Sequence, residues 1–380
     1  MLKTACESLL NSDIIDIMKK LTHPITVTII TTVFLLALPF ILPKKQTIQY
    51  SDKALREAAL SGNMLPVPQT YEALLKVVDN PENPMSAKKI TLGRELFFEP
   101  LLSKHKDINC ASCHILEEGG DDNLPTAIGD EGRENPSHLN SPTVLNAALA
   151  KSQFWDGNAK DVEEQAGGPI QAHFEMNMTP AEVEKRLKNS PDYIEKFEEV
   201  FGKISFENVR KAIGAYERTL LTYGAYDRFL EGDDSAINEK AKRGMTIFLT
   251  KGCKGCHTGM SVGGQSLQKF PLRADARIYD FRPNLEINPD LKITDKKFPF
   301  ENIGGFLGKG GNQIFRVPIL RNITKTAPYF HNGAIKDIED AVEIMGRHQL
   351  GINFTKEEIE EIVEFLKTLE GELVEYKIVD

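Results

Sequence analysis

Two pentapeptides with the pattern C-x-x-C-H constrain this chain more than any other feature of its sequence. They are residues 110–114 (CASCH) and 253–257 (CKGCH), and together they use four of the five cysteines. In this pattern the two cysteines form thioethers with the vinyl groups of a haem, and the histidine is the proximal ligand of the iron. One match occurs easily by chance, but two in one chain do not, so the sequence predicts two covalently bound haem c groups.

The predicted haem-binding residues are Cys110, Cys113 and His114 in the first motif and Cys253, Cys256 and His257 in the second. Two other uses of paired cysteines fit less well. A tetrahedral zinc site could take four thiolates, and a thioredoxin-like redox site could take one pair. Neither site requires a histidine directly after each pair, so neither alternative explains the whole pattern.

The composition is typical of a soluble globular body with about two domains of ordinary size. Apolar residues make up 41% of the chain and charged residues 27%, and the net charge is −9. This negative charge argues against nucleic acid as a partner. It is compatible with a basic redox partner, although net charge alone decides little.

A nearly continuous apolar run occupies residues 25–42, with lysines on both sides. It is close to the minimum length of a membrane-spanning helix, and no convincing signal-cleavage site follows it. We therefore expect a transmembrane anchor or uncleaved signal over residues 24–43, in preference to a cleaved signal. Because c-type haems are attached outside the cytoplasmic membrane in bacteria, the body is expected in the periplasm. It would be anchored to the inner membrane, with residues 1–23 in the cytoplasm.

Most of the remaining chain is predicted to be helical with long loops, and no segment alternates strongly enough to predict a sheet. Residues 44–70 are interpreted as a tether that ends in an extended segment. Local signals predict one helix opened by a capping box at Thr179, one from Pro191 to about Gly202, one over Val209–Leu220, and one opened by Thr355 and closed by Gly371.

A weak internal repeat precedes the two haem-attachment motifs. Residues 93–97 (GRELF) and 244–248 (GMTIF) both resemble the first helix of a cytochrome c fold, in which a small residue permits close helix packing. We therefore expect a mostly α protein with two cytochrome c-like haem domains, over residues 71–230 and 231–380. The boundary is placed at a polar, turn-like stretch over residues 231–234.

From about Pro84 to the C-terminus the chain resembles the bacterial di-haem cytochrome c peroxidases, within the cytochrome c peroxidase/MauG-type superfamily. The resemblance rests on three long and specific strings, SPTVLNAALAKSQFWDGNAKDVEEQAGGPIQAHFEMN (141–177), TAPYFHNGA (326–334) and AVEIMG (341–346). It implies a periplasmic enzyme that reduces hydrogen peroxide to water with electrons from a small c-type cytochrome or a cupredoxin. The C-terminal haem is expected to accept these electrons and pass them to the N-terminal, peroxidatic haem.

The resemblance assigns catalytic roles to Glu175, Gln165 and Trp155. Glu175 matches the distal acid/base of the family with Gln165 beside it, and Trp155, the only tryptophan, matches a residue between the two haems. Cleavage of the O–O bond needs a proton moved from one peroxide oxygen to the other, which a nearby carboxylate can do. On residue type alone, Glu175 would be a solvated loop residue and Trp155 an amphipathic aromatic at an interface.

In the C-terminal half, the resemblance implies that His257 and Met345 are the axial ligands of the electron-transfer haem. Such ligation raises the reduction potential of a haem. Met345 could equally be a core methionine, and His348, one helical turn further on, is a competing ligand by geometry. His331 matches a histidine near a haem propionate, and Arg316 is expected to play a similar charge-pairing role.

The resemblance also implies a calcium site between the domains, formed by Asn140 and by the backbone carbonyls of Thr326 and Pro328. Oxygen donors of this kind suit Ca²⁺, although no acidic cluster in the sequence would have predicted the site unaided. Members of the family are often homodimers, but the sequence offers no interface signal of its own.

One position departs from the family pattern. Many members carry a histidine directly after an Ile-Gly pair in the loop that follows the first haem motif, and it caps the peroxidatic iron in the oxidised state. Here Asp130 follows Ile128 and Gly129, and His138 is the only histidine in the loop. Either His138 replaces the missing ligand through a shifted loop, or no protein residue caps the iron and no reductive activation is needed. The spacing favours the second hypothesis.

Two other functions remain open from the sequence. A MauG-type oxidase acts on tryptophans of a partner protein and shares the fold, but it carries tyrosine where this chain has Met345. A membrane-tethered electron-transfer cytochrome without catalysis would not need Glu175 or Gln165.

Overall fold

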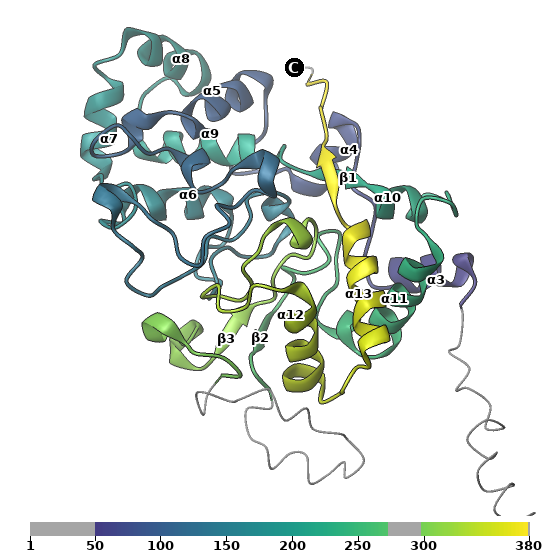
Figure 1. Cartoon of the computed structure of the whole chain (residues 1–380). Coiled ribbons are helices and arrows are strands. Elements are labelled where there is room, and N and C mark those ends of the chain that lie inside the picture. Colours follow the sequence, from purple (N-terminus) through teal and green to yellow (C-terminus); the bar gives the residue numbers. More distant parts are fainter. Residues whose placement is uncertain (1–49, 273–297, 379–380) are drawn as a thin grey trace, which may run out of the picture. The chain divides into compact units, whose positions relative to one another are not determined.

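The computed structural model describes residues 50–272 and 298–378, and this part of the chain is mostly helical (Figure 1). Its α-helices are α3 (Asp52–Leu60), α4 (Tyr71–Val78), α5 (Ala87–Phe97), α6 (Val162–Gln171), α7 (Pro180–Leu187), α8 (Pro191–Phe201), α9 (Phe206–Glu217), α10 (Ala225–Leu230), α11 (Glu239–Thr250), α12 (Ile338–Ile344) and α13 (Lys356–Thr368). Helix α12 continues directly into a π-helix, Met345–Leu350. The strands β1 (Thr222–Gly224), β2 (Leu267–Lys269), β3 (Ile314–Arg316) and β4 (Gly371–Leu373) form two antiparallel pairs, β1–β4 and β2–β3.

The predicted membrane anchor over residues 24–43 lies outside the described residues. Within 50–272 and 298–378, the structure has no helix that is both long and apolar enough to span a bilayer. The described end of the predicted tether is not simply extended chain, because it contains helix α3. Ser51 caps this helix, and Leu55 and Ala59, four residues apart, give it a buried apolar face that packs near α11.

The predicted helix starts are confirmed. Residues 179–182 and 355–358 form complete capping boxes at the N-termini of α7 and α13. Helix α8 ends at Phe201, and Gly202 follows it with a left-handed φ of 74°. The last helix stops at Thr368, three residues before the predicted Gly371, which instead begins β4. Gly371 therefore belongs to the strand that follows α13 and does not cap the helix.

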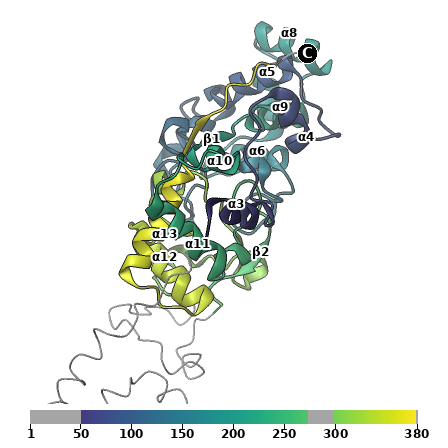
Figure 2. The same cartoon turned by 90° about the vertical axis from the view of Figure 1, so that its right-hand side faces the viewer.

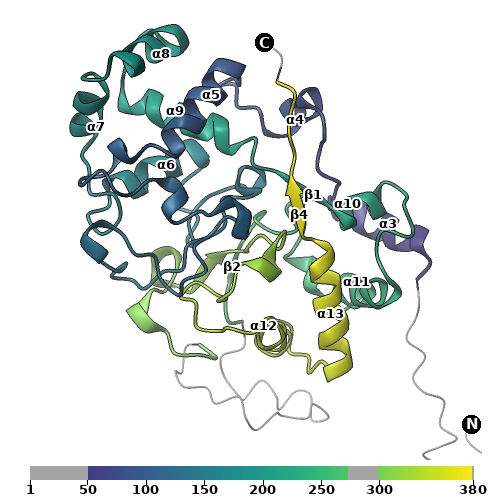
Figure 3. The same cartoon turned by 45° about the horizontal axis from the view of Figure 1, so that its top comes forward.

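The two small sheets were not predicted from the sequence. Each strand has only three residues, too few for an alternating pattern to be recognised. Their pairing is also distant in sequence: β1 follows α9, whereas its partner β4 follows α13 near the C-terminus (Figure 3). Each sheet therefore joins segments that are far apart in the sequence by backbone hydrogen bonds.

The helix that precedes each haem-attachment motif packs against a second helix, α5 against α9 and α11 against α13 (Figure 2). Each pair makes its closest backbone contact at a glycine. Helix α5 packs on α9, and a Cβ at Gly93 would lie 1.9 Å from the carbonyl oxygen of Ala212. Helix α11 packs on α13, and a Cβ at Gly244 would lie 1.7 Å from the carbonyl oxygen of Glu361. Only glycine permits such close backbone contact, so the weak sequence repeat corresponds to the same helix crossing in both halves.

Two large clusters of buried apolar side chains form the core. One contains residues of α5 to α9, with Phe97 and Phe197 fully buried. The other contains residues of α3, α10, α11 and α13, with Phe229 and Phe365 fully buried. Each cluster includes one of the glycine-mediated helix pairs, and each haem-attachment motif follows the first helix of its pair.

Candidate functional site

Each C-x-x-C-H motif lies in the wall of its own cavity. In the first motif a single 3₁₀ turn brings the N–H of His114 within 3.1 Å of the Cys110 carbonyl oxygen. In the second, the N–H of His257 lies 3.0 Å from the Cys253 carbonyl oxygen. This fold-back places two free thiols and one imidazole at the same cavity in each case. We call these the first and the second cavity.

The two imidazoles are prepared to bind a metal. The Nδ1 atom of His114 lies 3.1 Å from the Gly120 carbonyl oxygen, so Nδ1 carries the proton and Nε2 is left as a ligand. Burial lowers the pKa of His114 and lowers that of His257 to about 4. Both rings are therefore neutral at pH 7, which is the form that binds iron.

A buried cation with an unpaired donor tests whether the cavities fit a haem. Arg316 lines both cavities and is 4% exposed, and its Nε donates to the Phe154 carbonyl oxygen at 3.2 Å. Its Nη1 has no hydrogen-bond partner in the part of the chain that the structure describes. Burial lowers the pKa of Arg316 to about 10. Since an unpaired buried donor is costly, a propionate carboxylate of a haem would satisfy this arginine.

Glu175 and Gln165 both line the first cavity, together with His114. Gln165 comes from α6, and Glu175 comes from the loop that follows this helix. Burial raises the pKa of Glu175 to about 7, and no described residue donates a hydrogen bond that would offset this effect on its carboxylate. A carboxyl group that titrates near neutrality can both accept and donate a proton there.

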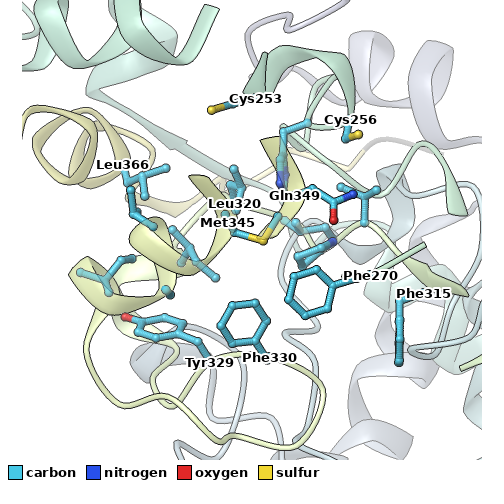
Figure 4. Close-up of a pocket in the computed structure, with 18 of the residues that line it drawn as sticks. Cys253, Cys256, Phe270, Phe315, Leu320, Tyr329, Phe330, Met345, Gln349 and Leu366 are labelled. Carbon is cyan, nitrogen blue, oxygen red and sulfur yellow. The ribbon is translucent and has the colours of Figure 1, made fainter. Parts of the chain in front are cut away.

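Met345 lines the second cavity with His257, and Figure 4 shows its sulfur pointing into the cavity interior. His348, the competing ligand, is buried but is not part of the cavity wall. A π-helix begins at Met345. Because π-helical hydrogen bonds join residues i and i+5, positions three apart no longer share a face. The π-helix thus separates the thioether from the imidazole.

The two cavities share part of their wall. Residues 140–143, Trp155 and Arg316 line both of them. The indole Nε1 of Trp155 donates to the Asn140 carbonyl oxygen at 2.8 Å, and the Arg316 N–H donates to the Trp155 carbonyl oxygen at 2.7 Å. These hydrogen bonds hold the tryptophan between the first and the second cavity. We call residues 140–143, Trp155 and Arg316 the shared wall.

His331 lines the second cavity and is buried in an aromatic cluster. Its ring stacks on Phe315 with centroids 4.8 Å apart, and its Nε2 lies 2.7 Å from Asn302 Oδ1. Its ring also meets Trp155 edge-on at 6.4 Å. Burial lowers the pKa of His331 to about 4, so it is neutral at pH 7. Between the two residues predicted near a propionate, only Arg316 carries a charge.

The three predicted calcium ligands, Asn140, Thr326 and Pro328, all line the second cavity. The Asn140 side chain donates through Nδ2 to the Leu124 carbonyl oxygen at 2.8 Å, which leaves Oδ1 as an acceptor. Within residues 50–272 and 298–378 no group of three or more His, Cys, Asp or Glu side chains is placed so that it could hold a metal ion. A cation here would be held by neutral oxygens, a donor set compatible with Ca²⁺.

Neither Asp130, which stands at the position of the family's capping histidine, nor His138, the candidate replacement, lines the first cavity. Asp130 is buried but is not part of the cavity wall. His138 also lies outside the wall, with its Nδ1 3.9 Å from Glu134 Oε2. Among the described residues that line the first cavity, His114 is the only histidine.

Two buried carboxyl groups were missed by sequence reasoning. Glu217, the last residue of α9, lines the first cavity, and burial raises its pKa to about 8. Asp121 lines the second cavity, and burial raises its pKa to about 7. Glu217 lies at a core position of the predicted Val209–Leu220 spacing, and an acid at such a position was the available signal. Nothing in the sequence distinguishes Asp121 from Asp122.

Known proteins resemble the chain over most of its length. A family model described as di-haem cytochrome c peroxidase matches residues 87–235. The cytochrome c551 peroxidase of Nitrosomonas europaea is 42% identical over 298 residues, which cover 78% of this chain and 84% of that protein. The cytochrome c551 peroxidase of Pseudomonas aeruginosa is 38% identical over 353 residues, covering 90% and 93%. The methylamine utilization protein MauG of Methylorubrum extorquens is 32% identical over 307 residues, covering 76% and 80%.

Solved structures show the same fold. A MauG-like protein associated with microbial copper homeostasis superposes with a TM-score of 0.63 at 24% identity, over 78% of this chain and 94% of that one. The diheme peroxidase BthA from Burkholderia thailandensis superposes with a TM-score of 0.58 at 18% identity, over 77% and 88%.

Proposed function

Because the chain belongs to the di-haem cytochrome c peroxidase family, we propose that it reduces hydrogen peroxide to water with electrons from a small c-type cytochrome or a cupredoxin. It is a peroxidase-type oxidoreductase, and the family implies two c-type haems. The two cytochrome c551 peroxidases that it matches support peroxide as the substrate and a small cytochrome as the donor.

The observation that carries this proposal is a half-buried carboxyl group, Glu175, in the same cavity as the first haem-attachment motif. A haem attached at Cys110 and Cys113 would supply the iron at which the O–O bond is cleaved. Glu175 takes the proton from one peroxide oxygen and delivers it to the other, which then leaves as water. Gln165, beside it in the cavity wall, orients the substrate by hydrogen bonding.

Substitution of Glu175 tests the proposal. Glu175→Gln keeps the size of the side chain but cannot shuttle a proton, so kcat with a reduced c-type cytochrome is expected to fall by about 10²- to 10⁴-fold. The matched control is Glu198→Gln, an exposed acid on α8. In the unchanged enzyme kcat/KM for peroxide should rise with pH through about 7, because the ionised form of Glu175 accepts the first proton.

The contrary outcome would be equally clear. If holoprotein with Glu175→Gln turns over peroxide as fast as the Glu198→Gln control, Glu175 is not the acid/base of the reaction. An absence of peroxide turnover in the unchanged holoprotein would instead leave an electron carrier. A solvated glutamate would also place the acid limb of the pH profile near 4.5 instead of near 7.

For the electron-transfer half, we propose His257 and Met345 as the axial pair and Trp155 as the residue on the electron path. The positions of His257 and Met345 in one cavity support the first assignment. The hydrogen-bonded indole in the shared wall supports the second. Met345 also favours a peroxidase over a MauG-type oxidase, in which tyrosine is expected at this position.

The domain organisation is part of the proposal. We assign residues 71–230 to the peroxidatic domain and residues 231–380 to the electron-transfer domain, supported by the two apolar clusters, each of which includes one helix crossing. Helix α3 belongs to the second cluster although it precedes both domains in sequence.

We also propose Ca²⁺ bound by Asn140, Thr326 and Pro328, supported by their common position in the second cavity. Periplasmic location through an anchor at residues 24–43 rests on the sequence.

A further inference from the structure

Asp130 is a buried carboxylate, 1% exposed, that binds three side chains. Its Oδ1 lies 2.7 Å from His105 Nδ1, and its Oδ2 accepts hydrogen bonds from Asn177 Nδ2 at 2.9 Å and from Arg133 Nη1 at 3.0 Å. Burial alone would raise the pKa of Asp130, but the hydrogen bonds from Asn177 and His105 and the charge of Arg133 lower it. The group is therefore ionised at neutral pH. We call these four residues the Asp130 clamp.

The Asp130 clamp holds residues 173–177, the loop that carries Glu175. The main-chain N–H of Asp130 donates to the Glu175 carbonyl oxygen at 2.8 Å. Arg133 Nη1 donates to the His173 carbonyl oxygen at 3.0 Å, two residues before Glu175. Asn177, two residues after Glu175, donates to the Asp130 carboxylate. The loop is thus hydrogen-bonded to residues of the Asp130 clamp before Glu175, at Glu175 and after it.

Gly129 makes the fourth contact with this loop. A Cβ at this position would lie 2.2 Å from the Phe174 carbonyl oxygen and 2.5 Å from Glu175 Cα. Because any side chain here would displace the backbone of Glu175, the two main chains touch directly at this position. Gly129 also lines the first cavity, whereas Asp130 does not.

The supporting loop is itself held firmly. The N–H of Gly129 donates to the Arg133 carbonyl oxygen at 2.8 Å, and the N–H of Gly132 donates to the Gly129 carbonyl oxygen at 2.9 Å. Between them Glu131 has a φ of 55°, which is uncommon for a residue other than glycine and persists only when its surroundings fix it. An ion pair with Arg133 fixes Glu131.

These contacts matter because the carboxylate of Glu175 receives no hydrogen bond from any described residue. Its position is therefore set by its own backbone and by packing. We propose that the Asp130 clamp, with Gly129, positions Glu175 for proton transfer, so that Asp130 is a positioning residue of the peroxidase reaction. This inference rests on the proposed role of Glu175. A displacement of about 1 Å at a reacting group can cost on the order of a hundredfold in rate.

Asp130→Ala tests the inference in the holoenzyme. The substitution removes the clamp but leaves the first cavity's wall intact, so kcat for peroxide is expected to fall by roughly ten- to a hundredfold while KM for the donor cytochrome stays the same. The matched control is Asp107→Ala, which removes an exposed acid two residues from His105. This variant should keep the kcat of the unchanged enzyme. Asp130→Asn keeps one acceptor oxygen and should recover part of the loss.

A double variant separates positioning from a general loss of structure. If Asp130 acts only through Glu175, then adding Asp130→Ala to Glu175→Gln should cause no further loss of kcat. A further loss of the size seen in the single variant would overturn the inference, because Asp130 would then act elsewhere. The absorbance of both haems is measured in every variant to compare their occupancy.

Gly129→Ala covers the case in which Asp130→Ala fails to fold. It leaves every hydrogen bond of the Asp130 clamp available and displaces Glu175 by sterics, so a similar fall in kcat is expected. If Glu175→Gln abolishes turnover but Asp130→Ala and Gly129→Ala both match the Asp107→Ala control, the clamp inference is wrong and the peroxidase proposal stands. If Glu175→Gln itself retains turnover, the proposed acid/base role of Glu175 is the one that fails.

Discussion

Three carboxyl groups in or next to the first cavity have different acidities because their surroundings differ. Asp130 has three hydrogen-bond donors, and its pKa is lowered despite burial. Burial without such donors raises the pKa of Glu175 to about 7 and that of Glu217 to about 8. The same chemical group is therefore ionised at neutral pH at one position and titrates near neutrality at another.

Glu217 allows a prediction about stability. Its pKa is about 8 in the folded chain and near 4.5 when unfolded, so the folded protein loses stability as the pH rises through this window. Glu217→Gln removes the charge, so it should raise the free energy of unfolding at about pH 9 by on the order of 1–4 kcal/mol and change little near pH 4. Thermal unfolding of the holoprotein at both pH values measures this. A gain of equal size at both would contradict the titration.

At the scale of secondary structure, the closest helix packing in each half occurs at a glycine, Gly93 between α5 and α9 and Gly244 between α11 and α13. Gly93→Ala and Gly244→Ala each place a methyl group against a carbonyl oxygen of the partner helix, which forces the helices apart. Each substitution is expected to lower the free energy of unfolding by about 3 kcal/mol or more. Gly255→Ala is the control, because nothing lies within 4 Å of a Cβ at that position.

Chemical denaturation of the three holoproteins gives this comparison. Similar stabilities for Gly93→Ala and Gly255→Ala would show that α5 and α9 can separate without cost, and would remove the crossing as a reason for the sequence repeat. Loss of stability in Gly244→Ala alone would limit the argument to the second helix pair.

The sequence predicted those elements whose signals are local. The capping boxes at Thr179 and Thr355 are complete within four residues, and both helices begin where expected. The strands are too short to carry a pattern, and their pairing depends on where α9 and α13 end. In the same way, each haem-attachment motif is a run of five consecutive residues, so the sequence alone predicts it.

The Asp130 clamp could not be predicted because its members are brought together only by the tertiary fold. His105 is 25 positions from Asp130, and Asn177 is 47 positions away. The sequence showed that aspartate replaces the expected histidine, but it gave no sign of the partners. Likewise, His348 and Met345 were equal by helical spacing, and the π-helix that distinguishes them has no recognised sequence signal.

At the scale of the whole molecule, the arrangement of histidines predicts the resting state of the enzyme. His114 is the only described histidine in the wall of the first cavity, and His138 points to Glu134 instead. The fully oxidised protein as purified should therefore give a high-spin ferric signal for the haem at the first motif and turn over peroxide without prior reduction. Electron paramagnetic resonance and an immediate peroxide assay measure both.

The His138→Ala variant completes this experiment, and its spectrum should equal that of the unchanged protein. Two low-spin haems, with activity only after partial reduction, would mean that a residue outside the described cavity wall moves in to cap the iron. A change to high spin in His138→Ala would then identify His138 as that residue.

The shared wall has a consequence for how such chains can be recombined. Residues 140–143 and Trp155 come from the N-terminal half, whereas Arg316 comes from the C-terminal half, and the Arg316 main chain is hydrogen-bonded to Trp155. A hybrid that joins one half of this chain to the other half of a relative would therefore split a single partition between two parents. The halves are not interchangeable modules, and a working hybrid needs these residues to be exchanged together.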